Sequence, residues 1–216
     1  MWSWSFTWEI LPQILEAIQT TILATVIGFA LAIVGGLILA FGRRVKQRWL
    51  SVVVAGIIEF VRSTPLLVQL YFLFYGLPAI GISFGPFTAG VLGLGIHYSA
   101  YLSEVYRSGI DAVPKGQWEA AKALNFSRGK TWSRIILPQA IRPIVPVLGN
   151  YLLVMFKETP ILSAITLVEM LLTAKMIGSA SFRYLEAFTL VGILFLVLSY
   201  VSTLLIRRLE TRWGRL

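Results

Sequence analysis

The chain has 216 residues, of which 57% are hydrophobic and only 13% charged, with a mean hydropathy of +0.78. This composition excludes an ordinary soluble domain, which needs more charge to cover its surface, and predicts an all-α integral membrane protein. Cysteine is absent, which excludes disulfides, zinc–thiolate sites and thiol catalysis. The net charge of +9 is compatible with nucleic-acid binding, so its distribution along the chain matters.

Hydropathy predicts a single transmembrane domain over residues 1–216, because a spanning helix needs roughly 20 apolar residues and little else then fits. The five predicted spans cover residues 14–41, 50–73, 87–105, 141–156 and 188–206. An apolar but interrupted stretch at 159–181 is predicted to be a half-helix or a re-entrant segment. A hydrophilic loop at 108–139 separates spans three and four.

The basic residues gather on one side of this predicted topology. Of the 19 lysines and arginines, 15 follow spans one, three and five. The positive-inside bias therefore places the N-terminus outside and the C-terminus in the cytoplasm, which an odd number of spans also requires. The charge marks topology and contact with anionic lipids; no interleaved basic and aromatic patch supports nucleic-acid binding.

The first span carries a small residue at every fourth position, which lets another helix backbone approach closely. This ridge consists of Thr20, Ala24, Gly28, Ala32, Gly36 and Ala40. The ridge favours packing within the chain, and a contact with another subunit is the alternative.

The loop between spans three and four has the pattern of two short helices. Trp118, Ala121 and Leu124 share one face at helical spacing. Asn125 stands where that helix should end, since asparagine is the commonest substitute for glycine in a left-handed C-cap. Ser127 is a candidate N-cap for the second helix.

The second helix has its own apolar side and a predicted end. Trp132, Ile135 and Ile136 supply the apolar side, and Pro138 is expected to stop the helix. The predicted result is a helix-turn-helix at the membrane surface that displays apolar side chains among charges.

The spacing of this loop resembles the EAA motif of ABC importer permeases. Glu119-Ala120-Ala121, three residues, a turn residue, nine residues and then Ile135-Ile136-Leu137-Pro138 carry the resemblance. It implies the type I ABC importer permease fold, with the loop forming coupling helices that sit in a groove of an ATPase subunit. The residues expected to contact that ATPase are Glu119, Ala120, Ala121, Leu124, Asn125, Leu137 and Pro138. The family has glycine where this chain has Asn125, a mild departure because both residues tolerate positive φ.

Further segments resemble one branch of this family, the polar amino-acid permeases. EFVRSTPLLVQ (59–69) and KETPILSAIT (157–166) carry this resemblance, and longer stretches are most similar to permeases of ectoine and hydroxyectoine importers. The resemblance implies an ATPase dimer, a second permease chain (identical or paralogous) and an extracytoplasmic solute-binding protein in a bacterial inner membrane. Gly129-Lys130-Thr131 only imitates a phosphate-binding loop, because the required earlier glycine is replaced by Leu124. This chain is therefore expected to bind no cofactor and to be no enzyme itself, with ATP and magnesium on the partner.

Charges within the second predicted span are the first candidates for a cargo pathway, because burying a charge in hydrocarbon is costly. Glu59 and Arg62 are three residues apart and can pair on one helix face. Pro65 follows and must disturb the helix. The pair is interpreted either as fixing this kink or, together with Gln69, as lining the pathway.

A second group of candidates follows span four. Thr159-Pro160 interrupts the helix, and broken helices commonly line cargo cavities. Glu158, Thr159 and Glu169 are predicted to face the pathway, Glu169 having no obvious local partner on its apolar segment. Holding an outer gate or contacting the receptor protein is the alternative.

Two other classes of function are alternatives to an importer permease. A passive channel would share the spans but would need no ATPase. His97 and Ser99 invite comparison with an intramembrane hydrolase, but the sequence has no Gly-x-Ser-x-Gly motif. His97 is therefore interpreted as a packing or hydrogen-bonding residue.

Overall fold

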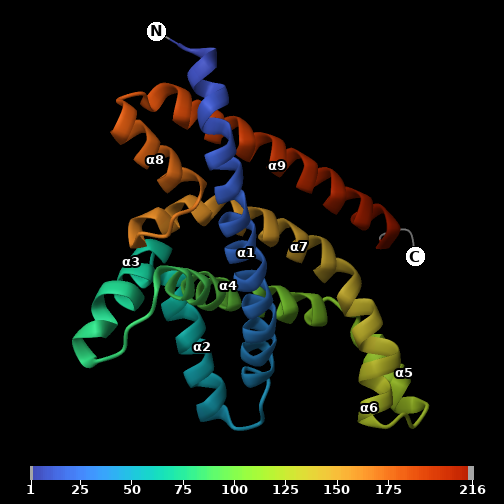
Figure 1. Ribbon diagram of the computed structural model, residues 1–216. Helices are drawn as coiled ribbons and strands as arrows, with labels where there is room; N and C mark the ends of the chain where they lie inside the picture. The colour runs from blue at the N-terminus through green and yellow to red at the C-terminus, as the bar shows by residue number, and fades with distance from the viewer. Residues whose placement is uncertain (1, 214–216) are drawn as a thin grey trace.

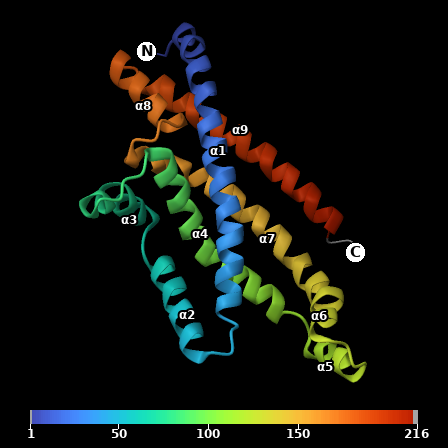
Figure 2. The same ribbon diagram turned by 60° about the horizontal axis from the view of Figure 1, so that its bottom comes forward.

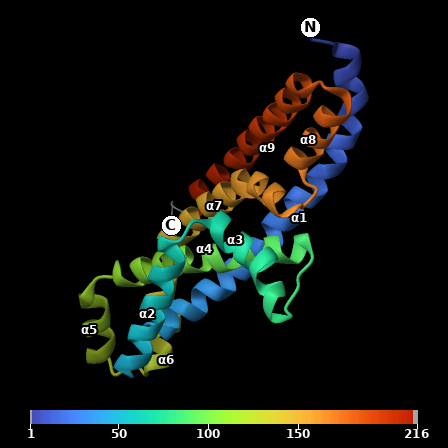
Figure 3. The same ribbon diagram turned by 90° about the vertical axis from the view of Figure 1, so that its left-hand side faces the viewer.

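A computed structural model describes residues 2–213 of the chain, with side chains described as far as residue 208. The described residues form helices joined by short connections and contain no strand, which confirms the all-α prediction (Figure 1). The N-terminal end of the first helix and the two short helices of the hydrophilic loop lie at opposite ends of the molecule (Figure 3).

Helix α1 (Trp4–Gly42) is the longest element, with 39 residues. At 1.5 Å per residue it extends about 58 Å, roughly twice the hydrocarbon thickness of a bilayer. Its small-residue ridge packs on α4 (Pro86–Asp111): Gly28 lies against Leu94, and a Cβ added at Gly36 would lie 2.9 Å from the Cβ of Leu102. The predicted intramolecular packing of this ridge is confirmed.

The second predicted span is broken in the middle. Helix α2 (Arg48–Ser63) makes an angle of 102° with the segment Leu66–Ile80, which begins with helix α3 (Leu66–Tyr71) (Figure 2). The break follows from Pro65, which has no N–H to donate and forces Thr64 into an extended conformation. The predicted disturbance at Pro65 is confirmed, and residues 50–73 do not form one continuous helix. That this bent segment is one span stays a prediction. The chain continues through η1 (Phe72–Gly76) and η2 (Leu77–Ile80).

Helix α4 is the centre of the molecule and packs against α1, α2, α3 and α7. Its buried side chains include polar groups such as His97, Ser99 and Ser103. A helix enclosed by other helices need not be apolar on every face, because its polar groups find partners inside the bundle. This helix contributes more buried residues to the main hydrophobic core than any other helix does.

The hydrophilic loop contains α5 (Lys115–Ala123), α6 (Arg128–Thr131) and the π-helical turn η3 (Trp132–Ile136), which leads directly into α7 (Leu137–Glu158). The expected stop near Pro138 is wrong. The N–H of Leu137 donates to the carbonyl of Trp132, five residues back. This widened turn accommodates the proline ring that would collide with an ordinary α-helical carbonyl.

The interrupted stretch after α7 forms η4 (Thr159–Ile165) and α8 (Met170–Ser181), followed by α9 (Tyr184–Trp213). Helix α8 has 12 residues, about 18 Å, which is too short to cross a bilayer and agrees with the predicted half-helix. By length and apolarity, three segments of the described chain suffice to cross a membrane, or four if the bent α2–α3 pair is one span. They are Trp4–Gly42, Arg128–Ile165 and Tyr184–Arg208. Five spans were predicted, and the one missing from these four is the third, which corresponds to α4. That α4 crosses the membrane stays a prediction.

Candidate functional site

The two helices of the hydrophilic loop are held together by an aromatic contact. The rings of Trp118 and Trp132 meet edge to face, with centroids 5.3 Å apart. Ala121 beside them is 1% exposed. These apolar side chains therefore turn inward and fasten α5 to η3, and are not displayed outward as predicted.

The turn between the two helices is capped as the sequence predicts. Asn125 has φ 54°, in the left-handed region. The N–H of Phe126 donates to Ala121 and that of Asn125 to Lys122, both at 3.0 Å, which is the Schellman pattern. The hydroxyl of Ser127 accepts the N–H of Lys130 at the start of α6.

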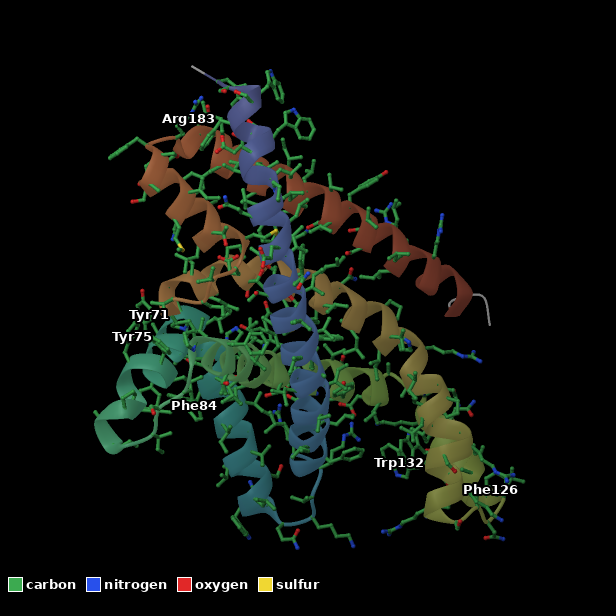
Figure 4. All side chains as sticks on the ribbon, viewed as in Figure 1. Tyr71, Tyr75, Phe84, Phe126, Trp132 and Arg183 are labelled. Atoms are coloured by element: carbon green, nitrogen blue, oxygen red, sulfur yellow. The ribbon has the colours of Figure 1, made fainter. Side chains whose placement is uncertain are left out.

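The outward surface of the loop carries most of the predicted ATPase-coupling residues. Glu119, Ala120, Leu124, Asn125 and Pro138 are exposed, Leu137 is half-buried and Ala121 is buried. Leu124 lies beyond the end of α5 and is 68% exposed, so it does not share the face of Ala121. Phe126 points away from the body of the protein and is 41% exposed (Figure 4). The apolar side chains displayed among the charges are therefore Leu124 and Phe126 at the turn, rather than the two tryptophans.

An ion network joins the loop-proximal end of α4 to the end of α1. Glu104 pairs with Arg43 and also with Arg107, whose Nη2 lies 2.6 Å from its carboxylate. Asp111 pairs with Arg44 and with Arg107. Because α5 begins four residues after Asp111, this network fixes the base of the loop to α1.

A cavity of about 620 Å³ lies where the broken second span meets α4 and the end of α7. Its lining combines two cations, one carboxylate and aromatic groups. The lining residues are Arg62, Ser63, Thr64, Pro65, Leu66, Leu67, His97, Tyr101, Lys157, Glu158, Pro160 and Ile161.

The charges in the cavity are oriented by aromatic neighbours. The Arg62 guanidinium lies 5.4 Å from the ring centroid of Tyr101. The Tyr98 hydroxyl donates to the Glu158 carboxylate at 2.5 Å. A carboxylate and two cations around one cavity can together hold a small molecule that carries both charges.

Of the residues predicted in the second span, the structure brings only Arg62 to this cavity. The Glu59 side chain is 73% exposed, and its Oε2 lies 4.0 Å from Arg62 Nη1, at the limit of an ion pair. Gln69 does not line the cavity; it bonds to the backbone of the break and to His97.

Of the residues predicted after span four, Glu158 lines the cavity, whereas Thr159 and Glu169 do not and are fully buried. Thr159 donates to the Phe156 carbonyl at 2.7 Å. The inference that Glu169 has no local partner is wrong. Its carboxylate accepts the N–H groups of Leu171 and Leu172 at 2.9 and 2.8 Å and so caps α8.

Sequence reasoning missed Tyr101 and Lys157 as cavity residues. Tyr101 follows His97 by four residues, so the helical period of α4 was the available signal. Lys157 adjoins Glu158 at the helix break, which could have drawn attention to it. The Ser99 hydroxyl donates to the Ile96 carbonyl at 2.7 Å, and the Nδ1 of His97 faces Gln69, so Ser99 and His97 do not form a nucleophile–base pair.

A helical membrane domain with an open, charged cavity and a helix-turn-helix at one end has features expected of a transport component. Residues 32–215 match the family described as the binding-protein-dependent transport system inner membrane component. The chain belongs to this family and is a permease subunit of an ABC importer.

Individual relatives agree with this assignment. The chain is 48% identical over 203 residues to a probable amino-acid ABC transporter permease of Sinorhizobium fredii, covering 94% of this chain and 88% of the relative. It is 34% identical over 212 residues to the glutamine permease GlnP of Escherichia coli, covering 97% and 96%. The crystal structure of an amino acid ABC transporter with histidines has a TM-score of 0.94 and 32% identity, over 98% of this chain and 99% of that chain.

Proposed function

We propose that this permease forms the pathway of an ATP-driven importer for a small zwitterionic solute. The observation that supports it is the cavity that brings Arg62 and Lys157 together with Glu158. A solute with one carboxylate and one cationic group matches this lining. Its carboxylate can pair with Arg62 or Lys157 and its cationic group with Glu158, and these pairs replace part of the solute's hydration shell. Relatives described as permeases for glutamine and L-cystine support a polar amino acid.

The energy is proposed to come from a separate ATPase dimer that grips the loop around Glu119, Leu124 and Asn125. This chain binds no cofactor in this scheme, and ATP with magnesium is bound by the partner. ATP closes the ATPase dimer, and the loop transfers that motion to the helices as a lever, so that the cavity alternates between outward and inward access. Nucleotide binding biases a two-state element.

The remaining partners are an extracytoplasmic binding protein that delivers the cargo and a second permease chain, either identical or paralogous. The N-terminus lies outside and the C-terminus in the cytoplasm of a bacterial inner membrane. The excess of lysine and arginine around the loop and after the first helix supports this orientation.

The cargo is proposed to be a polar amino acid, and the resemblance of the sequence to ectoine and hydroxyectoine permeases makes these solutes the second candidates. Binding of glutamine, arginine, ectoine and hydroxyectoine to the cognate receptor protein would be compared by calorimetry. Selectivity for one of them identifies the cargo class, because the receptor protein delivers the cargo to the permease in this scheme.

Reconstitution tests the mechanism. The permease, its ATPase and its receptor would be placed in proteoliposomes, and uptake of the receptor's cargo measured with and without ATP. We expect uptake only with ATP and all subunits. Equal uptake without ATP or without the ATPase would show a passive channel and overturn the importer proposal.

A further inference from the structure

The break between α2 and α3 leaves backbone carbonyls without helical partners. A helix normally satisfies the carbonyl of residue i with the N–H of residue i+4, and the proline at position 65 has no N–H to offer. Residue 64 is extended and its amide has left the helix. An unsatisfied carbonyl inside a helical bundle costs about 1–3 kcal/mol, so the 102° bend needs replacement donors.

Two side chains supply those donors. The Thr64 hydroxyl points back at the carbonyls of Phe60 and Val61, at 3.0 and 3.2 Å. The Gln69 Nε2 reaches from α3 to the carbonyl of Val61 at 2.8 Å, to that of Thr64 at 3.1 Å and to the Thr64 hydroxyl at 2.7 Å. The amide of α3 therefore bonds directly to the end of α2 across the bend.

The other end of the amide is bound to α4. The Oε1 of Gln69 lies 3.2 Å from the Nδ1 of His97, which is 8% exposed. Because Nε2 faces carbonyl oxygens, Oε1 must be the acceptor, and the Nδ1 of His97 carries the proton. One carboxamide thus connects three helices: α2, α3 and α4.

The bonded segment also forms one wall of the cargo cavity. Arg62 and Thr64 belong to both the bend and the lining, and His97, which bonds to Gln69 from α4, also lines the cavity. The Tyr101 hydroxyl, from the next turn of α4, lies 3.5 Å from the Arg62 carbonyl. A change in the bend angle would therefore move Arg62 relative to Glu158 across the cavity.

We infer that Gln69 is a positioning residue, which holds the α2–α3 bend through its amide and thereby places Arg62 in the cavity without contacting cargo. The role assigned to the cavity rests on the proposed function. The fixation of the bend does not, because it requires neither cargo nor ATPase.

The test measures the bend directly. The chain contains no cysteine, so single cysteines at Val53 on α2 and Ile80 on η2 can carry spin labels without removal of native thiols. Both positions are exposed, at 51% and 70%. Their distance distribution would be measured by pulsed EPR in the purified permease–ATPase complex without cargo.

Three variants are compared with the parent pair. Gln69→Met keeps the length of the side chain and removes its hydrogen bonds, and Thr64→Val removes only the hydroxyl. Val68→Met is the matched control, because it puts the same thioether on an exposed neighbouring position of α3. We expect a broadened or shifted distribution in Gln69→Met, a smaller change in Thr64→Val and the parental distribution in Val68→Met.

Parental distributions in both Gln69→Met and Thr64→Val would overturn the inference, whatever the transport assays give. In proteoliposomes with glutamine as the probe, Gln69→Met should lower uptake about tenfold at unchanged ATP hydrolysis. A variant that only lost folded protein would lower both in proportion. If ATP proves unnecessary for uptake, the proposed function fails while the EPR result still decides the role of Gln69.

Discussion

Trp118 and Trp132 meet edge to face, with an interplanar angle of 82°, and this ring pair packs α5 against η3 in the hydrophilic loop. Such pairs contribute about 0.5–1.5 kcal/mol beyond their buried area. Trp118→Ala should therefore raise the local opening of the loop roughly tenfold. Trypsin cleavage at Lys122 on α5, or at Arg128 or Lys130 on α6, reports this opening. Trp49→Ala is the control, because it removes an exposed tryptophan of α2, outside the loop. Equal cleavage of the two variants would show that the Trp118–Trp132 contact does not hold the loop closed.

The left-handed turn at Asn125 predicts an unusual pattern of substitutions. Asn125→Gly should leave stability unchanged, because glycine adopts φ 54° without strain. Asn125→Val should cost about 1–2 kcal/mol, since a β-branched residue is poorly tolerated there. Thermal unfolding of the purified protein in detergent measures both. The control Gly116→Val places valine in open space on α5, and a loss as large as that of Asn125→Val would argue against a turn-specific effect.

Local signals explain which parts of the fold and site could be predicted. Asn125 and Ser127 act through their own backbone neighbourhood, so their caps were readable from the sequence. Pro65 predicted that the helix is disturbed. The size of the bend, however, depends on Gln69 and its bond to His97, which lies 28 residues further along the chain. Such a contact leaves no local pattern.

Two predictions from the sequence are wrong, one about Pro138 and one about Glu169. Pro138 was expected to end a helix, whereas a π-helical turn absorbs it and the helix continues. Glu169 was expected to be without a partner because the side chains around it in the sequence are apolar. Its partners are backbone N–H groups two and three residues ahead, and side-chain patterns do not reveal them.

Glu119 on the outward surface of α5 is expected to contact the ATPase. Glu119→Lys should leave membrane insertion intact and reduce ATP-dependent uptake by at least about tenfold, because like charge at a docked surface costs several kcal/mol. Uptake and ATP hydrolysis in proteoliposomes measure the loss of coupling. Glu9→Lys makes the same charge change near the other end of the molecule and should have little effect. Unchanged uptake in Glu119→Lys would count against the lever.

The ion network at the base of the loop can be tested by charge exchange. The Glu104 side chain is only 20% exposed, so water screens its charge incompletely. Glu104→Arg therefore places a third cation next to Arg43 and Arg107 and leaves both without their carboxylate partner. We expect a loss of about 1–3 kcal/mol in stability, read from thermal unfolding. Adding Arg43→Glu to Glu104→Arg restores one opposite-charge pair and should recover part of the loss. Additive losses in the double variant would show that the two residues do not interact.

Glu169 provides the sharpest contrast between a cargo role and a structural one. Its carboxylate is fully buried and caps α8, where the helix dipole also favours negative charge. Glu169→Ala should therefore destabilise the protein by about 0.5–2 kcal/mol, and Glu169→Gln by less, because an amide oxygen still accepts one of the two N–H groups. Hydrogen exchange at the amides of Leu171 and Leu172 measures the fraying. Glu158→Gln is the comparison, since it removes a charge that lines the cavity and should reduce uptake without faster exchange in α8. If Glu169→Gln abolished uptake while exchange in α8 stayed at the parental rate, Glu169 would belong to the pathway after all.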